Sequence, residues 1–283
     1  MPEKAEELVL EEITINTGDE YSVHADFRTT DKRAEMPVII VSHGFLGYKR
    51  WGFFPYLSEE LARGGFHVLT MSFSMNGTDE ETGMITDPEA FAKNTVSREI
   101  EDMTTVVKHI EGGGLGVPFS SIGLFGFSRG GAVAIVVASR LEGIGAVATW
   151  GTPSRFDRYS DRRKKLWKLD GSLVFKDPRA ENPLSLDYSY YEDIDRNRAE
   201  QDIVKAASSL EIPHLMVHGT RDQAVTLKET EKLVNTNRKG PVVYKKVRGA
   251  SHSFGVKHPM KNINKCLQEA VESTLRFFKD NLY

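Results

Sequence analysis

The stretch Gly126-Phe127-Ser128-Arg129-Gly130 has the pattern G-x-S-x-G, and its two flanks decide what that pattern means. An apolar stretch typical of a buried strand, residues 121–125, precedes it. A run of small apolar residues, 131–138, follows it and predicts a helix packed against a sheet. A serine between such a strand and such a helix lies on a tight turn, with its hydroxyl exposed and a helix N-terminus behind it. We therefore expect Ser128 to be a nucleophile rather than an ordinary helix-capping serine.

Two later loops carry the acid and the histidine that an activated serine needs. The apolar run 213–218 ends in a glycine-containing turn, and Asp222 follows in that turn. His252 follows the alternating run 242–247 in the same way. The carboxyl ends of parallel strands meet at one edge of a sheet, so loops far apart in the sequence converge there. The pattern therefore predicts that Ser128, Asp222 and His252 come together.

These residue types suit nucleophilic catalysis. A serine hydroxyl is a weak nucleophile until a neutral imidazole takes its proton, and a carboxylate holds that imidazole in the right tautomer. A further apolar run, residues 38–41, leads into Ser42-His43-Gly44-Phe45. The backbone N–H groups of Phe45 and Arg129 are placed to form an oxyanion hole. We expect His43 to form hydrogen bonds within this loop, and His218 to be a core histidine.

Four motifs resemble those of the α/β-hydrolases and together extend over nearly the whole chain. The sequence is similar to the dienelactone-hydrolase-like and cinnamoyl-esterase-like bacterial branches, which show H-G-F, G-x-S-x-G, H-G-x-x-D and a late G-x-x-H. The resemblance implies these site residues: Ser128 as nucleophile, Asp222 as acid, His252 as base, and the Phe45 and Arg129 amides as oxyanion donors. The chain departs from many relatives at residues 72–77, Ser-Phe-Ser-Met-Asn-Gly, where they carry D-x-R-G-x-G. That loop often borders the active site, so the resemblance implies the triad but not the substrate.

Strand and helix patterns alternate from residue 37 onward, which predicts an α/β fold of the α/β-hydrolase type with a mostly parallel, doubly wound sheet. An antiparallel hairpin over residues 8–29 is expected at the sheet edge. Strands are expected near residues 38–42, 67–73, 121–126, 146–150, 214–218 and 242–247. Helices are expected near residues 52–63, 95–111, 129–140, 226–235 and 262–280.

A long segment interrupts this alternation between the fourth and fifth core strands. It has about sixty residues, far more than the usual two to six for such a connection. We therefore divide the chain into an α/β-hydrolase core, residues 1–151 and 211–283, and a lid insertion, residues 152–210.

The lid itself is expected to contain a hairpin, residues 172–175 with 184–190, and a helix over residues 195–210. Its basic run, Arg162-Arg163-Lys164-Lys165, is interpreted as a solvated helix face rather than a site for an anionic substrate. Packing of the lid onto the core accounts for most of its aromatic residues, Trp167, Tyr188, Tyr190 and Tyr191. Three aspartates of the lid are alternatives to Asp222 as the acid: Asp193, Asp195 and Asp202.

Composition is consistent with a soluble enzyme. A chain of 283 residues, 40% hydrophobic and 27% charged, is long enough for one large core. Its formal charge of −3 gives no reason to expect a nucleic acid or a membrane as partner. Its single cysteine, Cys266, excludes an internal disulfide and leaves no zinc cluster, so no metal or cofactor is expected. Residues 1–7 are polar and lack the apolar core of a signal peptide, so a cytoplasmic location is expected.

We expect a serine hydrolase that cleaves small to medium acyl or aryl-acyl esters through an acyl-enzyme intermediate. The expected partner is a small-molecule ester, and a homodimer is left open. The substrate pocket is expected to include Leu46, Trp150, Val225 and Phe254. The same triad also serves amidases, peptidases and acyltransferases, and a non-catalytic binding protein is a further alternative.

Overall fold

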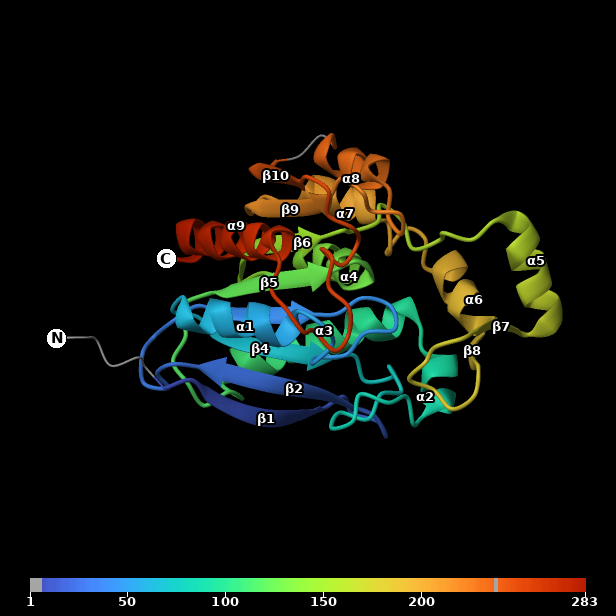
Figure 1. Ribbon diagram of the computed structural model, residues 1–283, viewed down its shortest axis with the longest axis horizontal. Coiled ribbons are helices and arrows are strands. Elements are labelled where there is room, and N and C mark those ends of the chain that lie inside the picture. The colour runs from blue at the N-terminus through green and yellow to red at the C-terminus, as the bar shows by residue number, and fades with distance from the viewer. Residues whose placement is uncertain (1–6, 237–238) are drawn as a thin grey trace.

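The computed structural model describes residues 7–236 and 239–283, and its centre is a sheet with the strand order β1-β2-β4-β3-β5-β6-β9-β10 (Figure 1). The strands are β1 Val9–Asn16, β2 Ser22–Thr29, β3 Val38–Ser42, β4 His67–Ser72, β5 Ile122–Phe127, β6 Ile144–Trp150, β9 His214–Gly219 and β10 Val242–Val247. The first two form the expected antiparallel hairpin at the edge, β2 pairs antiparallel with β4, and the remaining pairs are parallel. The mostly parallel sheet is confirmed.

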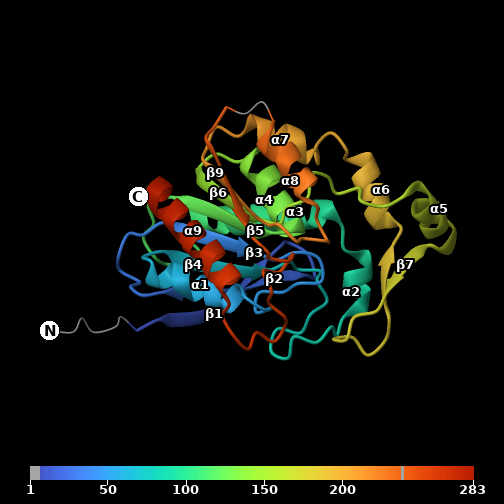
Figure 2. The same cartoon turned by 45° about the horizontal axis from the view of Figure 1, so that its top comes forward.

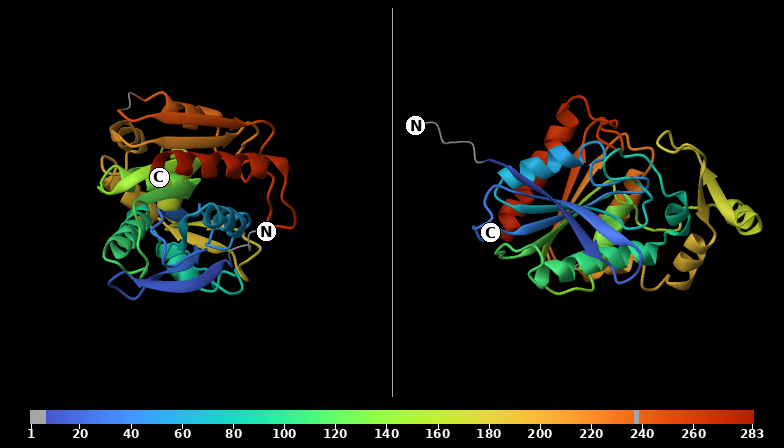
Figure 3. Two further views of the ribbon diagram at one scale, coloured as in Figure 1. Left: turned by 90° about the vertical axis from the view of Figure 1, so that its left-hand side faces the viewer. Right: turned by 90° about the horizontal axis from the view of Figure 1, so that it is seen from below.

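Helices cover both faces of this sheet, as Figure 3 shows. One face carries α1 Phe54–Arg63 and α9 Lys265–Leu282. The other face carries α3 Val96–Glu111, α4 Arg129–Ala138, α7 Ile203–Ser209 and α8 Leu227–Val234. Every residue of strands β3 and β5 is buried, because helices cover the side chains on both faces of the sheet. This arrangement confirms the prediction of a doubly wound α/β fold.

The segment between β6 and α7 extends beyond the carboxyl ends of the core strands, away from both chain termini (Figure 2). It contains α5 Asp161–Asp170, β7 Ser172–Phe175, β8 Leu184–Asp187 and α6 Ser189–Arg196. Strands β7 and β8 pair antiparallel, as expected for the hairpin. A short helix that the sequence analysis missed, α2 Pro88–Lys93, packs against β8.

The expected single helix over residues 195–210 is wrong, because two helices, α6 and α7, occupy this region. Asp202 has an extended backbone, with φ −72° and ψ 99°, which no residue inside a helix adopts. Its side chain accepts a hydrogen bond from the Lys205 N–H at 3.0 Å and so caps a new helix. The sequence pattern places Asp202 inside a helix, whereas in the structure Asp202 is the cap at the start of α7.

Two expectations concern a membrane-spanning helix and a signal peptide. Within residues 7–236 and 239–283, no helix combines the length and the apolar character that crossing a membrane requires. The expectation that the chain lacks a signal peptide rests on its first residues, and positions 1–6 lie outside the described residues.

Candidate active site

Ser128 lies on the turn between β5 and α4, at the carboxyl edge of the sheet. Its backbone has φ 54° and ψ −120°, a conformation that costs free energy for a residue with a side chain. Glycines make the turn possible, because a Cβ on Gly126 would lie only 2.4 Å from the carbonyl oxygen of Gly130. The hydroxyl of Ser128 is thereby turned away from the helix that follows it and toward the loops at the sheet edge.

The three residues singled out from the sequence lie in hydrogen-bonding contact. The Nε2 atom of His252 is 3.0 Å from the Ser128 hydroxyl oxygen. Its Nδ1 atom is 2.7 Å from Oδ2 of Asp222. An ionised Asp222 accepts a hydrogen bond from the Nδ1–H group, so the proton of the neutral imidazole stays on Nδ1 and the lone pair of Nε2 is free to accept a hydrogen bond from the serine hydroxyl. Among the described residues, the three alternative aspartates have other partners: Asp193 binds Ser97, Asp195 pairs with Arg198, and Asp202 caps α7.

Asp222 is held by more partners than the sequence analysis identified. Its Oδ1 atom accepts hydrogen bonds from the backbone N–H groups of Ala224 and Val225, at 2.9 and 2.8 Å. Nε2 of His218 lies 3.1 Å from Oδ2. Burial raises the pKa of the Asp222 carboxyl, but the hydrogen bonds from His218 and His252 outweigh it and hold the pKa well below its usual range.

His218 is thus a site residue whose contact with the acid was not foreseen. It is fully buried, as a core histidine should be, and its Nδ1 atom lies 2.6 Å from the Thr230 hydroxyl. The signal was present in the sequence, because the motif H-G-x-x-D itself begins with this histidine. The chain reverses direction at Gly219, so His218 and Asp222 face one another across the turn.

The loop after β3 lies directly against the serine turn. A Cβ on Gly130 would be 2.2 Å from the carbonyl oxygen of His43, and one on Gly44 would be 2.9 Å from the Cβ of Ser128. In the described part of the chain, the backbone N–H groups of Phe45 and Arg129 donate no hydrogen bond to another protein group. Both are therefore available to an oxyanion formed at Ser128.

His43 holds this loop as a neutral imidazole. Its Nε2 atom accepts a hydrogen bond from the Phe73 N–H at 3.0 Å, so the proton resides on Nδ1, which lies 2.8 Å from the carbonyl oxygen of Gly44. Burial lowers the pKa of His43 to about 3. Both ring nitrogens of this buried histidine therefore form hydrogen bonds that support the shape of the loop.

The side chain of Arg129 has a role separate from that of its amide. The guanidinium forms an ion pair with the buried carboxylate of Glu99 on α3 and donates a hydrogen bond to the Tyr190 hydroxyl of the lid at 3.3 Å. It also lies over the ring of Phe45, 4.6 Å from the ring centroid. One side chain therefore joins α3 of the core, Tyr190 of the insertion and the loop that carries Phe45.

Two clefts share Phe45 in their walls, and Ser128 lines the first of them. The first has a volume of about 560 Å³ and is lined by Phe45, Ser128, Arg129, Pro153, Arg155, Phe156, Arg158, Tyr159, Ser160, Arg163, Phe175 and Tyr190. The second has a volume of about 430 Å³, and its apolar wall contains Leu46, Trp51, Phe54, Phe127 and Val256. Volumes of this size are typical of small-molecule sites.

The expected pocket needs correction at three positions. Leu46 lines the second cleft, but Trp150, Val225 and Phe254 line neither and are fully buried. Trp150 is directed into the core, where its indole N–H donates to the Thr274 hydroxyl at 2.9 Å and its ring packs on that of Phe254. Trp150 and Phe254 belong to the core cluster that also contains residues of α9, and Val225 is buried where its backbone N–H donates to Asp222.

The lid residues are divided between packing and the cleft. Trp167 stacks with Tyr190 and contacts Tyr188 and Tyr191 within the lid, which agrees with a packing role for most of these rings. The interpretation of the basic run as a solvated helix face is only partly correct. Lys164 pairs with Asp157, whereas Arg163 lines the first cleft together with Ser128.

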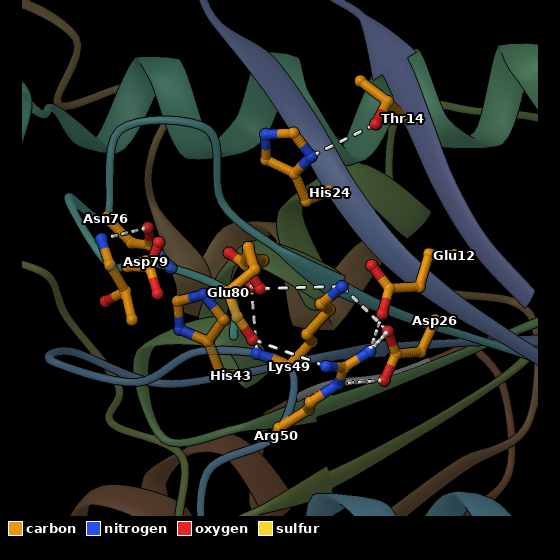
Figure 4. A network of polar contacts seen from close by, with 12 residues as sticks. Glu12, Thr14, His24, Asp26, His43, Lys49, Arg50, Asn76, Asp79 and Glu80 are labelled. Carbon is orange, nitrogen blue, oxygen red and sulfur yellow. Dashed lines mark hydrogen bonds and ion pairs between the residues drawn. The ribbon is translucent and has the colours of Figure 1, made fainter. Parts of the chain in front are cut away.

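A buried cluster of charges anchors the far end of the loop that carries Phe45. Figure 4 shows Lys49 between two carboxylates, with its Nζ atom 2.8 Å from Asp26 and 3.7 Å from Glu80. The backbone N–H of Lys49 donates to the Ser72 hydroxyl, which in turn donates to Glu80 at 3.1 Å. Burial raises the pKa of Glu80 to about 7, although the ammonium of Lys49 acts in the opposite direction.

A model of the dienelactone hydrolase family matches residues 25–166. This range is half of the chain and includes both the loop of Phe45 and the turn of Ser128. A search by sequence among curated proteins found no match.

Several solved structures share the fold along the whole chain. The enzyme Est1E from Butyrivibrio proteoclasticus is 16% identical, with a TM-score of 0.69 over 95% of this chain and 98% of that one. A dienelactone hydrolase from Anabaena variabilis is 16% identical, with a TM-score of 0.61 over 98% and 99% of the two chains. An esterase from Pyrococcus furiosus is 18% identical, with a TM-score of 0.65 over 98% and 92%.

The raised pKa of Glu80 makes stability depend on pH in a defined direction. Between about pH 4.5 and 7 the unfolded chain has lost this proton and the folded chain has kept it, so stability falls as pH rises. Replacing the group by Glu80→Gln removes this loss. The free energy of unfolding of the variant, relative to wild type, should rise by up to about 3 kcal/mol from pH 5 to pH 8.

Urea unfolding at both pH values measures this difference, with the exposed neighbour Glu81→Gln as the control that should follow wild type. An equal pH dependence of wild type and Glu80→Gln would show that Glu80 titrates as an ordinary surface group.

Proposed function

The chain belongs to the dienelactone hydrolase family and is a carboxylic ester hydrolase, and on that premise we propose that it cleaves esters through an acyl-enzyme on Ser128. One observation carries the proposal: the continuous line of contacts from Asp222 through His252 to the Ser128 hydroxyl, at 2.7 and 3.0 Å. Such a line is what activation of a serine requires. The ester carbonyl binds with its oxygen toward the N–H groups of Phe45 and Arg129.

In the first half-reaction the Ser128 oxygen attacks the ester carbonyl while Nε2 of His252 takes the hydroxyl proton. The imidazolium that forms is stabilised by Asp222, which remains ionised because its pKa is held low. Negative charge develops on the carbonyl oxygen and is met by two preorganised N–H donors, a contribution typically worth 10²- to 10³-fold in rate per donor. The imidazolium then protonates the leaving alcohol.

In the second half-reaction a water molecule replaces the alcohol. His252 takes a proton from this water, the hydroxide attacks the acyl carbon, and Ser128 leaves with the proton returned by His252. The two clefts that share Phe45 support small to medium acyl or aryl-acyl groups as substrates, because each is the size of a small-molecule site. Est1E, whose fold is similar, has been solved with ferulic acid bound, which supports an aryl-acyl substrate.

Removing the nucleophile tests the proposal directly. Ser128→Ala should lower kcat for p-nitrophenyl butyrate by at least about 10³-fold, because Ser128 is the one hydroxyl in contact with Nε2 of His252 among the described residues. Steady-state kinetics measures this, with Ser139→Ala at the opposite end of α4 as a control that keeps its activity. Retention of a tenth of wild-type activity by a folded Ser128→Ala protein would move the nucleophile elsewhere.

The acid is tested by a substitution that keeps its shape. Asp222→Asn should lower kcat by up to about 10⁴-fold, because an amide favours the wrong tautomer of His252. Asp195→Asn in the lid is the matched control, since Asp195 is exposed and pairs only with Arg198 among the described residues. A larger loss in Asp195→Asn than in Asp222→Asn would place the acid in the lid.

Acyl length is the third test. We expect higher kcat/KM on p-nitrophenyl esters of about two to eight carbons than on the palmitate ester, because the clefts accommodate small groups. A series of acyl lengths measured below and above the micelle concentration checks this. Preference for palmitate, or a rate increase at the micelle concentration, would indicate a lipase-like site instead.

A further inference from the structure

The first cleft has a strongly one-sided charge. Its lining residues include four arginines, Arg129, Arg155, Arg158 and Arg163, and neither Asp nor Glu. The whole chain, by contrast, has a formal charge of −3. A concave wall lined by one sign of charge concentrates ligands of the opposite sign. The cleft that contains the reactive serine is therefore electropositive within a chain that is acidic.

Two of these arginines are neutralised and two are not. Arg129 pairs with Glu99, and Arg158 pairs with Glu229 at 3.0 Å. Across residues 7–236 and 239–283, the side chains of Arg155 and Arg163 form neither an ion pair nor a hydrogen bond, and both are exposed. The free guanidinium groups come from two elements of the insertion, the loop after β6 and helix α5.

The Tyr159 hydroxyl adds a neutral donor to the same wall. It has no hydrogen-bond partner within the described residues, and its ring packs edge-on against Trp167 at 4.9 Å. Burial raises the pKa of this hydroxyl, while three guanidinium groups of the cleft act in the opposite direction. They belong to Arg129, Arg163 and Arg158. Guanidinium and hydroxyl donors on one wall form a site that suits a carboxylate.

The second cleft differs in character and position. Most of its wall is apolar, although Lys257 and the ion pair of Arg179 with Asp177 lie at it as well. Val256, Lys257 and His258 come from the same loop as His252. The leaving alcohol takes its proton from His252, so it departs on the side of that loop. The acyl group then extends into the arginine-lined cleft, on the side of Ser128 and Arg129.

We propose that the preferred substrates are hemiesters of dicarboxylic acids, with the free carboxylate of the acyl part bound by Arg155 and Arg163 and an apolar alcohol in the second cleft. This rests on the proposed function of Ser128. Hydrolysis breaks the bond between the acyl carbon and the ester oxygen, consumes one water, and releases the alcohol and a dicarboxylic acid. Arg155 and Arg163 determine specificity and take no part in the proton transfers.

The first experiment compares two esters that differ only in charge, monobenzyl glutarate and the benzyl ester of glutaric acid monoamide. Wild type should show a kcat/KM ratio of roughly tenfold or more in favour of the carboxylate, and the ratio should fall as ionic strength rises. The double variant Arg155→Gln/Arg163→Gln should bring the ratio close to one. Arg162→Gln is the matched control on α5, since Arg162 is exposed and does not line the cleft, and it should keep the wild-type ratio.

Three results would overturn the proposal. The first is a wild-type ratio near or below one, and the second is a ratio that survives in the double variant. A carboxylate preference found only when the charge is on the alcohol, as in 4-carboxybenzyl butyrate against 4-carbamoylbenzyl butyrate, would also overturn it, because it would reverse the two clefts.

A binding measurement distinguishes failure of the proposed carboxylate site from failure of the proposed role of Ser128. Monomethyl glutarate should bind to the Ser128→Ala protein in calorimetry, dimethyl glutarate should bind at least about tenfold more weakly, and Arg155→Gln/Arg163→Gln in the same background should abolish the difference. Charge-selective binding without ester hydrolysis by wild type would retain the carboxylate site and reject the proposed reaction. Ester hydrolysis by wild type without charge-selective binding would retain the proposed reaction and reject the carboxylate site.

Discussion

The contact between the turn at Ser128 and the loop before Phe45 is the constraint on which the rest of the site depends. Glycines at positions 44 and 130 allow two backbone segments to approach more closely than any side chain permits. This approach places two amide donors beside one hydroxyl. The positive φ of Ser128 costs free energy, and it persists because β5 on one side and α4 on the other are both packed into the core.

Charged groups of the site lie in three different surroundings: a hydrogen-bonded carboxylate, buried ion pairs and exposed arginines. Asp222 is held ionised beneath His252 by hydrogen bonds. The buried pairs of Arg129 with Glu99 and of Lys49 with Asp26 lie behind the oxyanion loop, where loss of one partner would leave a buried charge unpaired. Arg155 and Arg163 of the insertion line the first cleft, and among the described residues their side chains have no partner. Compensated charges thus position the backbone, and uncompensated charges are left for a ligand.

Local patterns of apolar and polar residues predict most strands and helices of the fold. Buried strands of parallel sheets are continuous apolar runs, so β3, β5 and β9 are visible in the sequence without any knowledge of their neighbours. The ends of these strands located Ser128 and Asp222, because loops at the carboxyl edge of a parallel sheet converge. The sequence pattern indicates helix boundaries less clearly where polar residues interrupt it. The pattern over residues 195–210 therefore predicts one long helix, although Asp202 caps the separate helix α7.

The sequence by itself determined the order of strands and helices and the loops that carry reactive groups, because both depend on periodicity and on short motifs. Tertiary structure alone decided which side chains line the clefts. Trp150 and Phe254 are bulky and apolar like Leu46, yet they are buried in the core while Leu46 lines the second cleft. Arg162 and Arg163 are adjacent and chemically identical, and only Arg163 lines the cleft. The direction of a side chain depends on the orientation of its backbone relative to distant segments, and no local pattern records that orientation.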